Sequence, residues 1–368
     1  MELKNIVQIK SGKRMPKGTF LSNVKNSHPY IKVKDMQDFK TKLNDSFEYV
    51  PDDIFPKISK YIVNTGNVIL SIVGTIGNVS LIDKTLNNAS LTENCVKLIP
   101  NDTLLSEYLY YFLISPKGKA EIEKGIIGST QPKLPFYNIE QINIPLIDKT
   151  AQQHIVNTIG TIDDKIENNE KLINKIEEFL LLNFIKLDKC EGLVFYDIFN
   201  CFNGGTFKSS DYVEKSEYKL ITIKNIDGNG FNTDNATYIP KIDKYEKYKL
   251  KIGDILLTMT GAYLGRSGIV DEENCYLNQR VLKISGISKS FLYCFLKYNQ
   301  NEIFNLGKGS AQPNLSLSDL NCFPVNYDIN DINSFCDNDK YIDLIINLKI
   351  ETRKLKSLKA QYLTKFFN

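Results

Sequence analysis

The stretch Gly66-Asn67-Val68-Ile69-Leu70-Ser71-Ile72-Val73-Gly74 has a counterpart later in the same chain, Gly253-Asp254-Ile255-Leu256-Leu257-Thr258-Met259-Thr260-Gly261. Each copy is a short run of aliphatic and β-branched residues that begins and ends at a glycine, which is typical of a strand bounded by turns. We therefore expect the chain of 368 residues to form this strand twice, once in each half.

Three further matches flank this strand in the same order in both halves. They are Tyr30-Ile31-Lys32-Val33-Lys34 with Leu220-Ile221-Thr222-Ile223-Lys224, Tyr49-Val50-Pro51 with Tyr238-Ile239-Pro240, and Gly128-Ser129-Thr130-Gln131-Pro132-Lys133-Leu134 with Gly309-Ser310-Ala311-Gln312-Pro313-Asn314-Leu315. The offset drifts slowly along the chain, as small insertions and deletions in loops would cause. Because helical patterns such as 104–113 follow the strand-like segments, each half is predicted to contain a mixed α/β (α+β) domain.

A long helix is predicted after the first domain, because apolar positions alternate between spacings of four and three residues. These positions are Ile155, Ile159, Ile162, Ile166, Asn169, Ile173, Ile176 and Leu180. A stripe of this kind requires a partner surface. The polar member, Asn169, has two interpretations: it fixes the register of a helix pair, or it lies at an exposed edge.

The second half ends with a matching stripe. It consists of Tyr341, Leu344, Leu348, Glu351, Leu355, Leu358 and Tyr362. The two helices are expected to pack on each other as an antiparallel coiled coil, with a pseudo-two-fold axis relating the repeats; the alternative is that each packs on its own domain. The predicted division is a domain at 1–150, a helix at 151–187, a second domain at 188–333 and a second helix at 334–368.

Composition and missing motifs exclude several classes of function. A formal net charge of +3 indicates no broad basic field, so any nucleic-acid surface must be local. The chain lacks a membrane-length apolar stretch and a signal-peptide core, and its seven cysteines form no CxxC, so we expect a cytoplasmic protein without a metal site. It also lacks a Pro-Pro pair, and therefore the Asn/Asp-Pro-Pro-Tyr/Phe motif of an adenine methyltransferase. The GxxxxGK[ST] phosphate loop of a P-loop ATPase is absent as well. No catalytic residue and no cofactor are therefore predicted on this chain.

The order of domain, helix, domain, helix resembles the specificity subunit of type I restriction–modification systems. Pro145-Leu146-Ile147 followed by Ala151-Gln152-Gln153-His154-Ile155-Val156 is similar to that family's passage into its first long helix, although the family's Arg pair is absent. Asn203-Gly204-Gly205-Thr206 looks like the family's early Gly-Gly-Thr turn, and Gly253 to Leu257 matches its Gly-Asp-Ile-Leu-Leu strand. The resemblance covers nearly the whole chain.

This resemblance implies a non-catalytic subunit with two target-recognition domains, each reading one half of a bipartite sequence in double-stranded DNA. It further implies two methyltransferase subunits held on the helix pair and, in the full phage-defence complex, restriction/translocase subunits. S-adenosylmethionine, ATP and Mg²⁺ are then expected on those partners, where DNA methylation would occur. The alternatives are a stand-alone methyltransferase or nuclease with its own recognition domains, and a helical adaptor that reads no sequence.

Candidate DNA-contacting residues are basic, amide or aromatic side chains in loops whose backbone signals match between the halves. Lys and Arg would contact phosphates, and Arg, Asn and Gln would contact base edges. The candidates are Lys13, Arg14, Lys32, Lys34, Thr75, Asn78, Gln131 and Lys133 in the first domain, and Lys208, Lys224, Tyr263, Arg266, Gln279, Arg280, Gln312 and Asn314 in the second. The alternative for each is a solvated surface residue, and for Gln131 and Gln312 also a structural role.

Overall fold

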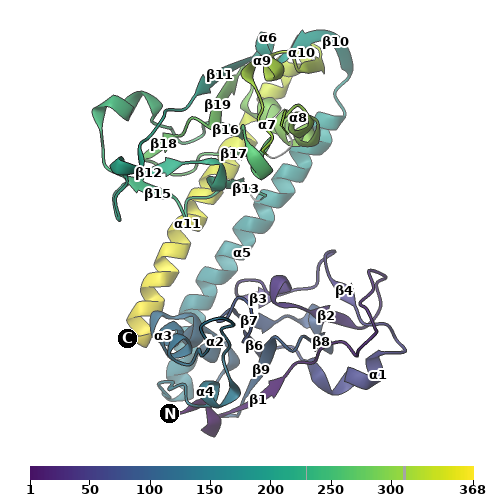
Figure 1. Cartoon of the computed structure of the whole chain (residues 1–368), viewed down its shortest axis with the longest axis vertical. Coiled ribbons are helices and arrows are strands. Elements are labelled where there is room, and N and C mark those ends of the chain that lie inside the picture. Colours follow the sequence, from purple (N-terminus) through teal and green to yellow (C-terminus); the bar gives the residue numbers. More distant parts are fainter. Residues whose placement is uncertain (229, 310–311) are drawn as a thin grey trace. The chain divides into compact units, whose positions relative to one another are not determined.

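The computed structural model describes residues 1–228, 230–309 and 312–368. The chain divides into two compact units: unit 1 comprises Met1–Ile166 with Leu355–Asn368, and unit 2 comprises Glu167–Lys354. Two long helices, α5 (Lys149–Ile185) and α11 (Asp339–Phe367), each contribute a segment to both units (Figure 1). Within the described residues, no helix is long and apolar enough to cross a membrane.

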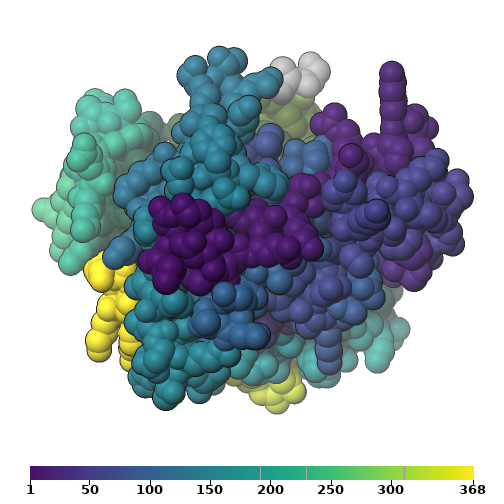
Figure 2. All heavy atoms as spheres, turned by 90° about the horizontal axis from the view of Figure 1, so that it is seen from below, coloured from purple at the N-terminus to yellow at the C-terminus, as the bar shows by residue number. Residues whose placement is uncertain are grey.

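Unit 1 contains two sheets. The first has the order β1-β9-β6-β7-β3, with β1 at Val7–Ser11, β9 at Cys95–Pro100, β6 at Val68–Ser71, β7 at Val79–Ile82 and β3 at Lys40–Thr41. The second has the order β4-β2-β8-β5, with β4 at Glu48–Tyr49, β2 at Pro29–Ile31, β8 at Ala89–Leu91 and β5 at Ile62–Val63. An isolated bridge joins Glu2 of the N-terminal segment to Asn143, and Figure 2 shows this segment in dark purple on the surface.

Unit 2 repeats the arrangement. Its first sheet has the order β11-β19-β16-β17, with β11 at Phe199–Asn203, β19 at Val281–Gly286, β16 at Ile255–Thr258 and β17 at Ser267–Ile269. Its second has the order β15-β12-β18, with β15 at Thr237–Ile239, β12 at Tyr218–Ile221 and β18 at Cys275–Leu277. Two further pairs join β13 (Ile226–Asp227) to β14 (Gly230–Phe231), and β10 (Lys189–Val194) to β20 (Pro324–Tyr327).

The strand registers show that the two units are copies of one fold. Equivalent partners are Ser71↔Cys95 and Thr258↔Val281 in the antiparallel pairs, and Ile31↔Leu91 and Ile221↔Leu277 in the parallel pairs. A register slip by one residue would turn every side chain to the opposite face of the sheet. The predicted duplication of a mixed α/β domain is therefore confirmed at the level of individual residue pairs.

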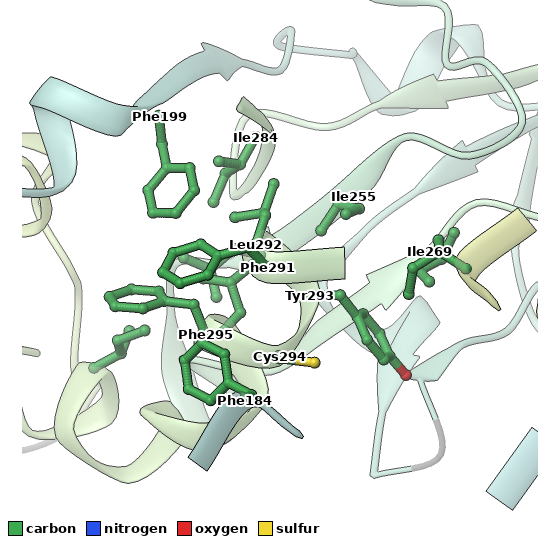
Figure 3. Packing of buried hydrophobic residues seen from close by; sticks show 14 of the residues in the cluster. Phe184, Phe199, Ile255, Ile269, Ile284, Phe291, Leu292, Tyr293, Cys294 and Phe295 are labelled. Carbon is green, nitrogen blue, oxygen red and sulfur yellow. The ribbon is translucent and has the colours of Figure 1, made fainter. Parts of the chain in front are cut away.

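Each unit also contains short helices, including one that packs directly on its first sheet: Ser106–Ile114 in unit 1 and Lys289–Tyr298 in unit 2. In unit 1 they are α2 (Ser106–Ile114), α3 (Pro116–Lys124) and α4 (Phe136–Glu140), with α1 (Phe55–Ile58) beside the second sheet; in unit 2 they are α6 (Phe195–Ile198), α7 (Lys289–Tyr298), α8 (Gln300–Asn305), α9 (Leu317–Asn321) and α10 (Ile329–Ser334). Serine caps begin α3 and α7, because the hydroxyls of Ser115 and Ser288 accept the N–H groups of Gly118 and Phe291. Figure 3 shows Phe291 of α7 and Phe184 of α5 in the same buried cluster, with their ring centroids 5.3 Å apart.

Within each unit, the α5 and α11 segments run antiparallel and share one core with the globular domain. In unit 1, Lys359 contacts Asp163, and the ring of Phe366 lies 6.3 Å from that of His154. In unit 2, Asn169 contacts Glu351, and the rings of Phe179 and Tyr341 lie 5.1 Å apart. Ile155 and Ile159 belong to the buried cluster that also holds Leu363 and α2. Both interpretations of the stripes therefore apply: the helices pack on each other and on their domains.

The α5 stripe is buried at all eight positions, whereas the predicted α11 stripe is out of phase. Leu344 and Leu358 are 40% and 39% exposed. The buried positions are Ile342, Ile345, Ile346, Leu348, Thr352, Leu363 and Phe367, while Tyr341, Leu355 and Tyr362 are half-buried. The prediction failed because α11 carries neighbouring apolar residues at 344–346 and faces both α5 and a domain, so its apolar face is wider than a coiled-coil seam.

Asn169 is only 4% exposed, so the interpretation as an exposed edge position is wrong. Its side-chain amide donates to the Glu351 carboxylate at 2.9 Å and to the Thr352 hydroxyl at 3.3 Å. Because a buried amide without partners would be costly, these bonds favour one alignment of α5 with α11.

Candidate nucleic-acid interface

A glycine brings the first loop of each unit against the sheet. A Cβ added at Gly12 would overlap the carbonyl oxygens of Leu91 and Thr92, and one added at Gly204 would overlap those of Leu277 and Asn278. Neither position tolerates a side chain, because carbonyl groups of the backbone cannot move aside as a flexible side chain can. The loop that follows each glycine is therefore held directly over the end of the parallel strand pair.

A buried hydroxyl ties the second loop, which follows β6 or β16. The Ser71 hydroxyl donates to the carbonyl of Thr75 at 2.6 Å and accepts the N–H of Asn78 at 2.9 Å. Thr258 does the same in unit 2, where it donates to Tyr263 and accepts the N–H of Arg266 at 3.1 Å. One hydroxyl thus ties each loop at two points; the intervening side chains are largely exposed in unit 1 and mostly buried or half-buried in unit 2.

The third loop is a hairpin formed by the repeated Gly-Ser-x-Gln-Pro-x-Leu element. Ile127 and Lys133 exchange two backbone hydrogen bonds in unit 1, as Lys308 and Asn314 do in unit 2. Gly128 has φ +91° and Gly309 has φ +109°, a region that favours glycine. Ser310 and Ala311 of this element lie outside the described residues. The hairpin bridges the second loop, through Val73↔Lys133 and Thr260↔Asn314.

Together these loops form one rim on each unit. Rim 1 is defined as residues 12–14, 72–78, 92–94 and 127–133, and rim 2 as residues 204–206, 259–266, 278–280 and the described part of 308–314. Backbone N–H groups join the loops to carbonyl oxygens of neighbouring segments. In unit 1 these donors and acceptors are Lys13 to Leu91 (2.7 Å), Ile72 to Asn94 (2.8 Å) and Leu134 to Ile72 (3.0 Å). In unit 2 they are Gly205 to Leu277 (2.8 Å), Met259 to Arg280 (3.0 Å) and Leu315 to Met259 (2.9 Å). The two rims therefore share one backbone frame.

Comparisons with known proteins agree with this duplicated architecture. A family model described as "Type I restriction modification DNA specificity domain" matches residues 1–178 and 195–327, which is most of the chain. The chain belongs to this type I DNA specificity family. Within the described residues, no group of three or more His, Cys, Asp or Glu side chains could hold a metal ion.

Individual relatives are similar over most of their length. The type I restriction enzyme MjaIX specificity subunit of Methanocaldococcus jannaschii is 26% identical over 326 residues, covering 79% of this chain and 74% of the relative. A putative type I specificity subunit of Mycoplasma genitalium, S.MgeORF438P, is 27% identical over 277 residues, covering 69% and 67%. The crystal structure of a type I restriction-modification system S subunit from M. genitalium has a TM-score of 0.60 at 18% identity, covering 100% of this chain and 95% of that one, which shows a shared fold.

Most of the predicted DNA-contacting residues of this family member lie on the two rims. Rim 1 carries Lys13, Arg14, Thr75, Asn78, Gln131 and Lys133, and rim 2 carries Tyr263, Arg266, Gln279, Arg280, Gln312 and Asn314. All of them are exposed except Tyr263 and Arg266, which are half-buried because the guanidinium stacks on the tyrosine ring at 4.8 Å. No contact with DNA is tested for any of them, so these assignments stay predictions.

Two predicted residues are already engaged in contacts within the chain. Arg14 donates to the Glu93 carboxylate at 2.5 Å, although its side chain is 80% exposed. Burial raises the pKa of Glu93, but the Arg14 hydrogen bond helps to overcome this effect and the pKa lies below its ordinary value. Gln279 accepts a hydrogen bond from the Thr206 hydroxyl at 2.7 Å.

Four predicted residues lie outside the rims. Lys32 and Lys34 follow β2 and both approach Glu48, so part of their charge is neutralised within unit 1. Burial lowers the pKa of Lys32 below its ordinary value. In unit 2, Lys224 lies in the short helix after β12, and Lys208 lies in the loop beyond rim 2; both are exposed.

Sequence reasoning missed Asn94, which belongs to rim 1 and is half-exposed. Its carbonyl accepts the N–H of Ile72, as the Arg280 carbonyl accepts that of Met259. Extending the repeat alignment past β8 and β18 would have paired Asn94 with Arg280.

Different polar contacts join each domain to the long helices. In unit 1, Gln152 is fully buried and its amide donates to the carbonyls of Thr103 (2.9 Å) and Ile147 (2.8 Å) while accepting the N–H of Leu105 (2.9 Å). In unit 2, the Asp339 carboxylate accepts the hydroxyl of Ser290 at 2.7 Å and its N–H at 2.8 Å. Each contact ties a helix start to the domain beside it.

Proposed function

We propose that this chain is the non-catalytic DNA-recognition subunit of a type I complex and that each unit reads one half of a bipartite target. The observation that carries this proposal is the pair of rims: they share the hydroxyl-tied loop, the hairpin and the bonds that join these loops, while most of their exposed side chains differ. Equal frames would place equivalent loops on DNA, because phosphate and shape contacts position a domain. Different side chains would then read different half-sites.

We further propose that the long helices hold the methyltransferase subunits. Leu172, Phe179 and Leu182 are exposed and lie within one face of α5, since their spacings are seven and three residues. Leu344 of α11, in the same unit, is exposed as well. Apolar side chains that remain exposed on a long helix suit a protein partner. S-adenosylmethionine, ATP and Mg²⁺ would be bound by the methyltransferase and restriction subunits of the assembled complex.

A domain replacement tests bipartite reading. Residues 1–150 are replaced by the corresponding segment of another family member, the complex is produced with its methyltransferase in a host free of adenine methylation, and the methylated motif is sequenced. We expect one half of the motif to change while the other half is retained; replacing 188–333 should change the other half. An unchanged motif in both replacements would contradict the proposal.

Two controls separate the alternatives. The purified chain alone, incubated with DNA and S-adenosylmethionine, should transfer no methyl group, whereas transfer would favour a stand-alone methyltransferase.

For the helix surface, Leu172→Asp and Leu182→Asp should abolish co-purification of the methyltransferase. The matched control Asn174→Asp adds the same charge on another exposed face of α5 and should leave co-purification intact. Equal retention in all three variants would contradict docking at this face.

A further inference from the structure

The arginines of the chain fall into two groups. The chain contains four arginines, which are Arg14, Arg266, Arg280 and Arg353. Arg14 pairs with Glu93, and Arg353 pairs with Asp271 and Glu272. Arg266 and Arg280 have no carboxylate partner among the residues that the structure describes. Each retains a planar fork of N–H donors that suits bidentate binding of an acceptor pair.

Both arginines without a carboxylate partner lie at the same end of one strand. The carbonyl of Arg266 accepts the N–H of Thr258 at 2.9 Å, and the carbonyl of Arg280 accepts the N–H of Met259 at 3.0 Å. They precede β17 and β19, the two neighbours of β16. The two side chains therefore leave rim 2 from either side of the last residue of β16.

Arg266 is also held in place before any ligand binds. Its guanidinium stacks over the ring of Tyr263, with the central carbon 4.8 Å from the ring centroid. The Thr258 hydroxyl bonds to the backbone of both residues, so one buried group positions the whole pair. Stacking restricts the long side chain while leaving its N–H edge available, which lowers the entropy lost on binding.

Rim 1 has asparagines at both equivalent positions. The carbonyl of Asn78 accepts the N–H of Ser71 at 2.9 Å, and the carbonyl of Asn94 accepts the N–H of Ile72 at 2.8 Å. Neither side-chain amide makes a recorded hydrogen bond within the described part of the chain. The same two sites on one backbone frame thus carry two guanidinium groups in unit 2 and two carboxamides in unit 1.

We infer that these four side chains read bases, with Arg266 and Arg280 reading guanine in one half-site and Asn78 and Asn94 reading adenine in the other. In the major groove, arginine bonds the O6 and N7 acceptors of guanine, whereas asparagine bonds the N6 donor and N7 acceptor of adenine. This inference rests on the proposed function, because it presumes that the rims meet DNA. It adds which residues discriminate and which base each pair selects.

Motif sequencing of the methylated host genome tests the inference. The full chain is produced with its methyltransferase as wild type and as Arg266→Ala, Arg280→Ala, Asn78→Ala and Asn94→Ala. The control is Lys251→Ala, which removes an exposed positive charge just before β16, at the end opposite rim 2. We expect each arginine variant to lose preference at one G·C pair, by roughly 5- to 150-fold, with the other half-site unchanged. The asparagine variants should relax A·T pairs in the other half-site, and the control should preserve the motif.

Three outcomes would overturn the inference. One is a bipartite wild-type motif whose unit 2 half-site contains no guanine on either strand. The second is a uniform loss of methylation in the arginine variants without relaxed sequence preference, which is the behaviour of phosphate contacts. The third is unaltered preference in all four variants. A wild-type motif that is not bipartite would instead contradict the proposed function itself, so the two failures are distinguishable.

A second variant separates base reading from folding. Arg266→Lys keeps the positive charge and the long stem but removes the bidentate fork. If Arg266 reads guanine, this variant should bind nonspecific DNA as the wild type does and lose discrimination at the same G·C pair as Arg266→Ala. Full discrimination with lysine would contradict a bidentate contact between the Arg266 guanidinium and guanine. Thermal unfolding of each variant verifies that the compared chains are folded.

Discussion

The rims of unit 1 and unit 2 differ in loop length while sharing the bonds that tie the second loop and join it to the hairpin and to the residue before β9 or β19. The loop tied by Ser71 spans from there to Asn78, and the loop tied by Thr258 spans one residue more, to Arg266. In both loops the hydroxyl donates to a carbonyl three residues before the residue whose N–H it accepts, so the extra residue of unit 2 lies between Thr258 and Tyr263. The difference teaches that these loops can vary in length and chemistry without disturbing the sheets beneath them.

The two units also differ in how a carboxylate of α5 is held. In unit 1, Asp163 accepts the Tyr111 hydroxyl at 2.9 Å and pairs with Lys359 of α11 at 2.6 Å. In unit 2, Glu177 accepts the Tyr293 hydroxyl and pairs with Lys297 of α7 at 2.8 Å. A tyrosine of the domain holds the carboxylate in both units, whereas the ammonium comes from the other long helix in unit 1 and from the domain in unit 2.

Breaking the ion pair of unit 1 should have the largest effect. Lys359→Ala leaves Asp163, which is only 5% exposed, without its ammonium partner. Removing one member of a buried pair typically costs about 3–5 kcal/mol, because the remaining charge stays desolvated. Urea unfolding should show this loss in the free energy of unfolding. Lys297→Ala is the matched comparison and should cost less, because Glu177 is more exposed than Asp163. Equal losses would contradict the contrast drawn between the two units.

Substitution of the closely packed glycine should destabilise both units to a similar extent. Gly12→Ala and Gly204→Ala each force a Cβ onto backbone carbonyl oxygens, and overpacking of this kind costs about 1–3 kcal/mol. Gly228→Ala is the control, since a Cβ there meets nothing within 4 Å and its φ is not positive. Thermal unfolding of the three variants measures the difference. If Gly12→Ala alone were tolerated, the frames of the rims would not be equivalent.

Repeat matching predicted the frame well and the side-chain environments poorly. The ordered glycines and strand-like runs predicted a duplicated mixed α/β domain, because backbone turns leave residue-specific signals such as Gly128 and Gly309, but they did not predict the strand order of the sheets. The phase of α11 was predicted wrongly, since Leu344 and Ile345 are equally apolar and only tertiary packing selects between them. Asn94 was missed because the repeat matches did not include the segments just after Leu91 and Leu277, where Asn94 aligns with Arg280; its bond to Ile72 joins segments that are distant in sequence.

The pH dependence of stability should have opposite signs in the two units. Burial raises the pKa of Asp163 above its ordinary value of 3.8 and outweighs the opposing effect of Lys359. Burial also raises the pKa of Glu177, but Lys297 and Tyr293 overcome it, so this pKa lies below its ordinary value of 4.5. As pH falls, native Asp163 takes up its proton before the unfolded chain does, which stabilises unit 1. Unfolded Glu177 takes up its proton before the native state does, which destabilises unit 2.

Hydrogen exchange of α2 and α7, followed from neutral pH down through pH 4, measures these two trends separately. Protection of α2 should rise and protection of α7 should fall in this window. Asp163→Asn should flatten the first trend and Glu177→Gln the second, which isolates each group from the other carboxylates. Parallel trends in the two helices, unaffected by these variants, would contradict the assignment.

The smallest effect on stability is expected at the rim itself. Arg14→Ala breaks the pair with Glu93, but the arginine side chain is 80% exposed, and solvent-exposed pairs contribute about 0–1 kcal/mol. Its role on rim 1 would be to contact phosphate, so the variant should unfold like the wild type while the salt dependence of DNA binding weakens by about one contact. Because it then weakens all sequences alike, its methylated motif should be unchanged, in contrast to Asn78→Ala on the same rim. A relaxed motif in Arg14→Ala would show that Arg14 contacts a base edge rather than a phosphate. Unit 1 would then also discriminate bases through a guanidinium.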